Sequence, residues 1–287
     1  MPELPEIETF RRRFLRGDED TPPLLGRRVT GIDLLWARTL DSPSPEEFEA
    51  RIVGQSIGDI GRRGKYLLLH LSTDTLAMHL RMSGDLWVEA DAAPVAAHHR
   101  LLLNLDGGIR LAFNDARKFG RVWLLADTET LLGKLGPEPL GDSFTPALFY
   151  AGLQTRRRQI KPLLLDQRFL AGMGNIYTDE ALHLAGLHPQ ARSSALTWEQ
   201  AARLWESIRH VLQEGIRRNG ASIDWVYRGG DFQNYFQVYQ RTGEPCYKCG
   251  TPIERIVVGQ RGTHFCPQCQ PAFPPLIGSK QNADDMD

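Results

Sequence analysis

The sequence predicts an α+β protein with two domains: a β-sandwich behind a short N-terminal helix, then a helical domain that ends in a four-cysteine hairpin. Three observations lead to this class. Residues 27–125 consist of short β-rich runs broken by Gly and Asp, and residues 147–217 have helical periodicity. All four cysteines lie near the C-terminus in two C-x-x-C pairs, and a length of 287 residues suits two modest domains.

The chain opens with the letters MPELPE. Removal of Met1 is expected because Pro2 is small, and it would leave a proline amine at the N-terminus. An α-amino group has a reference pKa near ~7.7–8.0, so part of it is neutral and nucleophilic at physiological pH. Attack of this secondary amine on an aldehyde would give an iminium cation, with Glu3 beside it to donate or accept a proton. Pro-Glu starts without any chemical role are also common, so the motif alone leaves both interpretations open.

Behind this start, apolar residues recur at helical spacing at Ile7, Phe10, Phe14 and Leu15, with arginines on the opposite face. A helix here would hold Pro2 and Glu3 in place. The β-rich runs that follow predict a sandwich or flattened barrel, and Asp106-Gly107-Gly108 predicts a hairpin turn. The expected strands are 29–36, 56–60, 66–71, 76–80, 85–88, 101–105, 109–113 and 122–125.

A Gly- and Pro-rich stretch at 133–146 predicts a linker. Helices are expected at 147–153, 162–166, 177–185 and 198–217, the last with Thr197 as its N-cap. The turn Gly172-Met173-Gly174-Asn175 precedes a helix, and such turns can hold a phosphate, although this signal is weak alone. The predicted limits are therefore a sandwich domain at 1–132, the linker, a helical domain at 147–240, a zinc finger at 241–272 and a disordered tail at 273–287.

The cysteines predict a structural zinc site. Cys246 and Cys249 are separated by 16 residues from the pair Cys266 and Cys269, which is typical of two knuckles that offer four thiolates. Disulfides are the alternative, but they need an oxidising compartment, and the first 30 residues contain no apolar signal core. Four thiolates leave no open position for water, so His264 is expected to face solvent or a partner.

Composition excludes a membrane protein and gives one hint of a polyanionic partner. The chain is 41% apolar and 24% charged with a net charge of −1, and it contains no apolar run long enough for a membrane span. Basic residues nevertheless gather at 62–65, 110–121 and 156–168, apart from acidic stretches at 18–20 and 46–49. Such segregation fits a basic groove with acidic flanks, although solvated surfaces also give charge runs. Without an export signal, a cytoplasmic protein is expected.

Taken together, these motifs resemble the bacterial formamidopyrimidine-DNA glycosylases of the Fpg/Nei family over nearly the whole chain. The resemblance rests on MPELPEIET, RRGKYLLL, HLRMSG, NDARKFG, LGPEPL, GMGNIYTDEAL and the terminal finger, in this order. It implies a helix–two-turn–helix motif in the helical domain, double-stranded DNA in the cleft between the domains, a monomer, one structural zinc ion and no other cofactor.

The resemblance also implies the chemistry. Such enzymes excise oxidised purines, notably 8-oxoguanine and formamidopyrimidines, and then cut the strand by β,δ-elimination. Pro2 would attack the sugar and Glu3 would donate a proton. Lys65 would act as a general acid and contact phosphate; without the motif, it reads as a surface lysine. Arg261, at the tip of the finger, would serve the δ-elimination.

By the same resemblance, the side chains of Met82, Arg117 and Phe119 would fill the gap that the everted nucleotide leaves in the base stack. A Met or Phe at the end of a strand is, however, more often part of a hydrophobic core. Phosphate contacts would come from basic and polar side chains in both domains. These are His98, Arg156, Lys161, Asn175 and Arg261.

Two departures from the family pattern weaken parts of this transfer. His98 and His99 are adjacent, with Arg100 where a second spaced histidine is usual, so the choice of His98 is open. The stretch 228–236 differs in sequence from the loop that usually closes over the everted base in this family, so lesion preference is the least secure expectation.

Three alternative functions remain: a Nei-type enzyme for oxidised pyrimidines, a zinc-finger protein that binds damaged DNA without cutting it, and a tautomerase that uses an N-terminal proline. Glu6 could reach the base edge.

Overall fold

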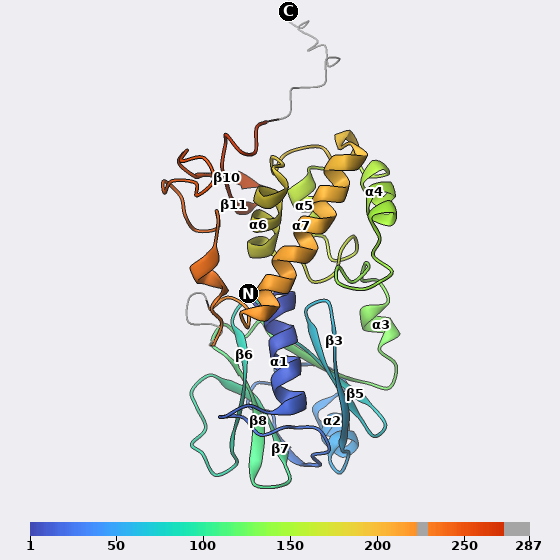
Figure 1. The fold of residues 1–287 in the computed structure, drawn as a ribbon. Coiled ribbons are helices and arrows are strands. Elements are labelled where there is room, and N and C mark those ends of the chain that lie inside the picture. Colours follow the sequence, from blue (N-terminus) through green and yellow to red (C-terminus); the bar gives the residue numbers. More distant parts are fainter. Residues whose placement is uncertain (223–228, 273–287) are drawn as a thin grey trace, which may run out of the picture.

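The computed structural model describes residues 1–222 and 229–272 and has the predicted α+β fold. Figure 1 shows the β-sandwich in the lower half and the helices with the zinc-finger hairpin in the upper half. The N-terminus lies where the two halves meet, and helix α1 runs down from it between the sheets. The predicted tail at 273–287 lies outside the described residues.

Two sheets form the sandwich. One has the antiparallel order β1-β7-β8-β6, and the other has the order β2-β9-β5-β4-β3, in which only β2 and β9 are parallel. The strands are β1 Val29–Asp33, β2 Leu40–Ser42, β3 Ile57–Arg63, β4 Tyr66–Leu71, β5 Thr75–His79, β6 Gly84–Ala90, β7 His99–Leu105, β8 Ile109–Asp115 and β9 Arg121–Leu125.

Alternation along each strand divides the side chains between two cores. Leu67 and Leu69 of β4 face the space between the sheets, where Leu103 of β7 also lies. Leu68 instead packs on the outer face with Trp123, beneath the short helix α3 (Glu129–Leu132). A period of two in the sequence therefore produces both layers.

Helix α1 (Leu4–Arg16) joins the two halves of the molecule. Leu4 belongs to the core of the helical domain, whereas Ile7, Phe10 and Phe14 belong to the core of the sandwich. Because the same helix is buried in both cores, its first turn is fixed at the junction. The expected anchoring of the N-terminus is confirmed.

The helical half contains the four expected helices, each within two residues of its expected limits: α4 Pro146–Gln154, α5 Ile160–Leu164, α6 Asn175–Ala185 and α7 Trp198–Arg217. Thr197 caps α7 as predicted, because its backbone N–H donates to Gln200 Oε1 at 2.9 Å and its hydroxyl accepts the Gln200 N–H at 3.3 Å. The finger hairpin consists of β10 Glu254–Val258 and β11 Arg261–Phe265.

Some elements were not expected. Helix α2 (Pro45–Ile52), which contains the acidic stretch at 46–49, is capped by Ser44 and buries Phe48 and Ile52. The first strand ends at Asp33, short of the expected limit at 36, because the backbone N–H groups of both Leu35 and Trp36 turn to Arg100 O. Three single-turn 3₁₀ helices complete the described residues: η1 Ala37–Thr39, η2 Ser193–Ala195 and η3 Phe232–Tyr235. None of the helices in the described part of the chain is both long and apolar enough to cross a bilayer.

Candidate active site at the domain junction

The N-terminal segment packs directly on the glycine-rich turn before α6. The Leu4 backbone N–H donates to Gly172 O at 3.2 Å, and Gly172 has φ +87°. A Cβ on Gly172 would lie 2.6 Å from a Leu4 methyl carbon, and one on Gly174 would lie 2.1 Å from the carboxyl carbon of Glu3. The turn is therefore rich in glycine because the start of the chain lies against it.

The anion at the N-terminus of α6 is the Glu3 carboxylate. Its Oε1 accepts the Ile176 N–H at 3.1 Å and its Oε2 accepts the Tyr177 N–H at 3.5 Å. These amides are among the unpaired donors that open a helix, and they carry its positive dipole end. The sequence suggested a phosphate at this turn, but Glu3 already occupies the helix N-terminus.

The surroundings of Glu3 favour a proton donor. Burial raises the pKa of Glu3 to about 7, against the lowering effects of Lys65, of the Ile176 N–H and of the chain's α-amino group. Glu6 adds to the rise in the pKa. A carboxyl group with a pKa near neutrality can give up a proton and regain it at physiological pH.

Lys65 lies close to the same carboxylates. Its side chain is buried, and this burial is the main cause that lowers the pKa of Lys65. The nearby charges of Glu3 and Glu6 raise this pKa, and the charge of Arg261 lowers it further. The α-amino group and Lys65 thus act on Glu3, and the finger-tip residue Arg261 acts on Lys65, so four predicted groups form one electrostatic network. The lysine comes from the β3–β4 turn and the arginine from β11, far apart in the chain.

A linker carboxylate holds the turn that carries Lys65. Glu138 Oε1 accepts the Gly64 N–H at 2.6 Å, and its two oxygens also bind Arg62 and Arg63 at 2.8 and 3.1 Å. The basic stretch at 62–65 is therefore opposed in space, although its own segment contains no acid. Glu138 belongs to the LGPEPL motif, but nothing in the local sequence predicted that it contacts the turn at Gly64.

Glu6 holds three elements together. Its Oε2 accepts the Glu3 backbone N–H at 2.7 Å, and its Oε1 accepts the Tyr177 hydroxyl at 2.7 Å and the Ala221 N–H at 2.8 Å. Both oxygens thus have partners within the protein, which does not support the suggestion that Glu6 reaches a base edge. Glu6 instead fixes the backbone next to Pro2.

The three predicted wedge residues come from two neighbouring loops. Met82 is half-buried, and Arg117 and Phe119 are exposed, with the guanidinium 5.2 Å from the ring centroid. Asp115 joins the loops: it accepts the Ser83 hydroxyl, the Arg117 N–H at 3.2 Å and the Gly120 N–H at 2.7 Å. A buried carboxylate therefore holds the two loops from which these three side chains project.

Replacing Asp115 by asparagine is expected to loosen both loops, because an amide cannot accept all three hydrogen bonds. The expected cost is about 1–3 kcal/mol of unfolding free energy, together with slower excision from duplex DNA. Denaturant titration and single-turnover cleavage check these effects. The exposed Asp33→Asn is the matched control, and an Asp115 variant that behaves like it would contradict the assignment.

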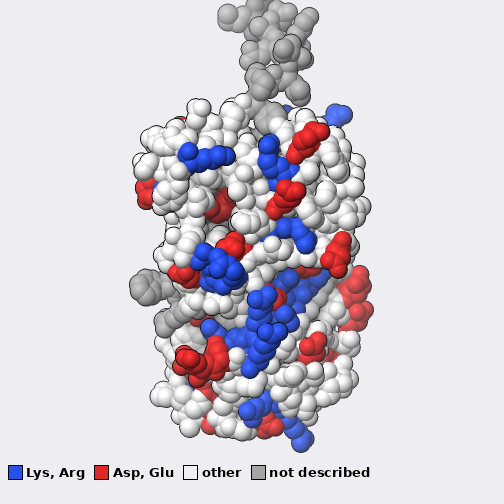
Figure 2. All heavy atoms as spheres, viewed as in Figure 1, with Lys and Arg blue, Asp and Glu red and all other residues white. Residues whose placement is uncertain are grey.

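Of the predicted phosphate contacts, His98 and Arg156 are exposed. His99 is buried beside Glu89, with 3.8 Å between Nδ1 and Oε1, which favours His98 of the two histidines. Figure 2 shows basic side chains gathered across the middle of the face that carries α1. On α1 itself, Arg11 and Arg12 are paired with Glu8 at 2.8 and 2.9 Å.

The structure gives Lys161 partners within the protein. Its side chain is fully buried, and Nζ contacts Asp179 Oδ1 at 2.6 Å and Gly262 O at 3.0 Å, so no free ammonium faces a phosphate. Asn175 is half-buried, and its Nδ2 also donates to Gly262 O, at 3.0 Å. Its Oδ1 is buried without a hydrogen-bond partner among the described residues. Both side chains bind the finger.

The four cysteines fit one structural zinc ion. Their Sγ atoms all lie within 4.8 Å of one another, and the pairs Cys246–Cys269 and Cys249–Cys266 are separated by 3.9 and 3.4 Å. Tetrahedral thiolate coordination at ~2.3 Å requires spacings of this order. The expectation for His264 is wrong: it is buried, and its Nδ1 lies 3.2 Å from Asp179 Oδ2.

Removing zinc is expected to weaken DNA binding more than it slows the amine chemistry, because Arg261 and its neighbours are carried by the finger while Glu3 and Lys65 are not. Titration of DNA affinity before and after chelation, with covalent trapping at saturating DNA, separates the two. An affinity that survives chelation would contradict the prediction, and zinc readdition is the control.

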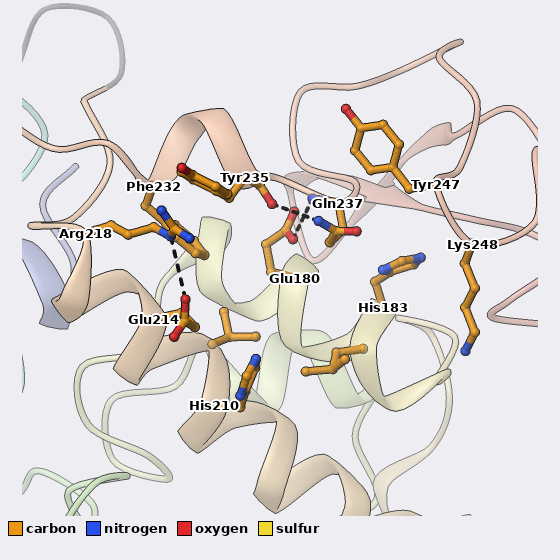
Figure 3. A pocket seen from close by; sticks show the side chains of 12 residues that line it. Glu180, His183, His210, Glu214, Arg218, Phe232, Tyr235, Gln237, Tyr247 and Lys248 are labelled. Carbon is orange, nitrogen blue, oxygen red and sulfur yellow. Dashed lines mark hydrogen bonds and ion pairs between the residues drawn. The ribbon is translucent and has the colours of Figure 1, made fainter.

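Behind η3 lies a separate pocket of about 490 Å³, between α6, α7 and the first cysteine knuckle (Figure 3). Tyr235 and Tyr247 lie on its rim, and Glu180 points into its centre. The Glu180 carboxylate accepts the backbone N–H groups of residues 237, 238 and 239 at 2.8–3.0 Å. This glutamate therefore fixes the chain segment that leads into the finger.

Comparison with known proteins covers nearly the whole chain. Three family models match: the formamidopyrimidine-DNA glycosylase N-terminal domain at residues 1–122, the H2TH domain of the same glycosylases at 135–226, and a zinc finger found in FPG and IleRS at 243–272. The formamidopyrimidine-DNA glycosylase of Chloroflexus aurantiacus is 51% identical over 278 residues, which is 94% of this chain and 98% of the relative. That of Pelotomaculum thermopropionicum is 44% identical, over 94% of this chain and 99% of the relative.

Solved structures agree with the sequence comparison. A Lactococcus lactis FPG mutant in complex with Fapy-dG-containing DNA is 37% identical and superposes with a TM-score of 0.87, over 94% of this chain and all of the other. A MutM structure with carbocyclic 8-oxo-G-containing DNA gives 38% identity and the same TM-score and coverage. With its fold, its four-cysteine finger and the buried Glu3 at the domain junction, the chain belongs to the formamidopyrimidine-DNA glycosylase family, the DNA-binding glycosylases of base excision repair.

Proposed function

We propose that this enzyme is a bifunctional DNA glycosylase and abasic-site lyase that removes oxidised purines, such as 8-oxoguanine and formamidopyrimidines, from duplex DNA. The observation that carries the proposal is the Glu3 carboxyl group, with a pKa raised to about 7, next to Pro2 and within the electrostatic reach of Lys65. A proton donor, an amine nucleophile and a buried cation then act on one sugar.

In the first step the lesion leaves the stack, at a cost of a few kcal/mol. After Met1 is removed, the Pro2 nitrogen attacks C1′; the N–C1′ bond forms, the glycosidic bond breaks, and the electron pair leaves with the base, which takes up a proton. Glu3 donates this proton to the base, takes up the proton that the Pro2 nitrogen loses, and passes it to O4′ as the sugar ring opens to the iminium. Lys65 assists as a second acid and contacts the phosphate.

Two eliminations follow from the iminium. Loss of a proton from C2′ breaks the C3′–O3′ bond, and loss of a proton from C4′ then breaks the C5′–O5′ bond, so both phosphates leave. Water hydrolyses the iminium and returns the free Pro2 amine. Arg261 is an exposed residue of the finger whose charge acts on Lys65, and it assists the second elimination by stabilising the departing phosphate.

The DNA would be held by both domains. Met82, Arg117 and Phe119 fill the gap in the stack, with Arg117 facing the orphaned base, while His98 and Arg156 bind phosphates. The choice of oxidised purines is supported by the DNA lesions in the two structural relatives, Fapy-dG and an 8-oxo-G analogue.

Borohydride trapping on abasic-site duplex DNA tests the central step. We expect a covalent adduct with the intact enzyme and none with Pro2→Gly or with protein that retains Met1. Strand cleavage without any trapped adduct would overturn the proposal and would favour a protein that binds damage without forming the iminium.

The substrate class has its own test. We expect excision from 8-oxoguanine opposite cytosine to exceed excision from a thymine glycol duplex. A clear preference for the pyrimidine would assign the enzyme to the Nei type while leaving the iminium chemistry intact.

A further inference from the structure

A buried polar cluster joins the helical domain to the finger. The Asp179 side chain has no exposed surface, and it accepts the Lys161 ammonium through Oδ1 at 2.6 Å. Its Oδ2 accepts the His264 backbone N–H at 2.9 Å and lies 3.2 Å from His264 Nδ1. One carboxylate thus holds a residue of α5 and a residue of β11.

A second acceptor continues the cluster. The carbonyl oxygen of Gly262 receives the Lys161 ammonium at 3.0 Å and the Asn175 amide at 3.0 Å. Nearby, a Cβ on Gly259 would lie 2.9 Å from Pro162, so the turn of the hairpin rests on α5. Residues 259–264 are therefore fixed at several points along one edge.

Arg261 lies within this fixed stretch, next to Gly262. Its side chain is exposed, and its charge acts on both Lys65 and Lys161 by lowering their pKa values. The neighbouring backbone is thus fixed, while the Arg261 guanidinium is exposed and acts electrostatically on Lys65.

Zinc alone would not hold this end of the hairpin. The strand β11 runs from Arg261 to Phe265, and the first thiolate after it is Cys266. At ~3.3 Å per residue, the five residues from Arg261 to Cys266 place Arg261 roughly 16 Å from the metal-bound end. A hairpin tethered at one end leaves its tip free to swing, and the Asp179 cluster removes that freedom.

A buried ion pair such as Lys161–Asp179 contributes little net free energy to folding. Taking Lys161 and Asp179 out of water is costly, and apolar pairs often stabilise a fold equally well. The pair instead fixes the orientation of the finger, because Asp179 binds His264 and Lys161 binds Gly262 O. This points to a positional role.

We propose that Asp179 is a positioning residue that, with Lys161 and His264, fixes the finger so that Arg261 reaches the sugar-phosphate during the second elimination. The inference rests on the proposed function, because it takes from it the role of Arg261. It adds the buried carboxylate that makes this role possible, and it replaces the phosphate contact expected of Lys161.

The test measures product partition on an abasic-site duplex in a single turnover. For Asp179→Asn we expect δ-elimination to fall about tenfold or more relative to β-elimination, since a misplacement of roughly 1 Å is costly to catalysis. Borohydride trapping should stay within about twofold of the wild type, because the junction residues Pro2 and Glu3 are untouched. The exposed Asp142→Asn is the matched control, and the zinc content of each variant is measured.

A double mutant separates this proposal from the one on which it rests. Arg261→Ala should lower the second elimination by itself, and adding Asp179→Asn to it should lower it no further. If Arg261→Ala leaves δ-elimination intact, the role given to Arg261 is wrong; if Arg261→Ala acts and Asp179→Asn does not, or if the two effects multiply, the positioning role of Asp179 is wrong.

His264→Ala guards against a folding defect. It keeps the Lys161–Asp179 pair and all four cysteines, so the fold and the zinc are expected to survive. We expect a smaller shift of the same product ratio. An unchanged ratio in a folded, zinc-loaded His264→Ala protein would overturn the proposal even if Asp179→Asn could not be purified.

Discussion

Replacing Glu3 by glutamine is expected to slow base excision by about 10²–10⁴-fold, the usual contribution of a general acid. The amide keeps the size of the side chain and can still accept the Ile176 N–H, so the fold should persist. What is lost is the proton that the departing base takes up and that the ring oxygen then needs as the sugar opens. Single-turnover excision of 8-oxoguanine measures the loss.

The same variant should change the pH profile. The pKa of Glu3 is raised to about 7, so its proton-donating form is lost as the pH rises through that value. The neutral amine increases over about the same range, near ~7.7–8.0. The wild type should therefore give a bell-shaped profile, and Glu3→Gln should keep only the rising limb. If the pH profile of Glu3→Gln is still bell-shaped, the general acid is a group other than Glu3.

Protein stability provides an independent check. A carboxyl group whose folded pKa lies above its unfolded value stabilises the fold below the unfolded pKa, and this contribution is lost as the pH rises through about 7. The unfolding free energy of the wild type should therefore decline between about pH 4.5 and pH 7 relative to that of Glu3→Gln, and the difference should level off above pH 7. The comparison needs no DNA.

The fold could be predicted largely because its elements have strong local periodicity. Leu67 and Leu69 alternate with Leu68, and the helical pattern of Ile7, Phe10 and Phe14 is equally regular. Helix α2 escaped because only two of its residues are buried, and the three-residue strand β2 is too short to show a period. Local pattern identifies an element only when one face is consistently apolar.

The site could be predicted as a set of residues but not as a set of contacts. Glu3, Lys65 and the cysteines carry recognisable motifs, and the structure brings the first two together. The partner that Lys161 and His264 share could not be predicted, because Asp179 lies 18 residues from one and 85 from the other. A lysine in a basic stretch looks exposed until the buried carboxylate that pairs with it is seen. Long-range pairing of this kind has no local signal.

Replacing Gly174 by alanine is expected to be as damaging as losing the acid itself. The added Cβ would lie 2.1–2.5 Å from the Glu3 carboxyl atoms, well inside contact distance, and Gly174 has an extended backbone that alanine can adopt. The methyl group therefore acts by displacing the carboxylate from the N-terminus of α6. Excision should fall by about 10²-fold or more, and thermal unfolding should occur at a lower temperature.

A second substitution shows whether displacement of Glu3 is the cause. Gly31→Ala, whose Cβ would lie 3.6 Å from its nearest neighbour, is the control and should behave like the wild type. In Glu3→Ala the space next to Gly174 is empty, so adding Gly174→Ala should cost little further stability and no further activity. Additive effects in this double mutant would mean that the glycine serves the turn itself. If the double mutant instead matches Glu3→Ala, position 174 is a glycine because the catalytic Glu3 carboxylate must lie against the N-terminus of α6. A single methyl group at position 174 prevents this contact.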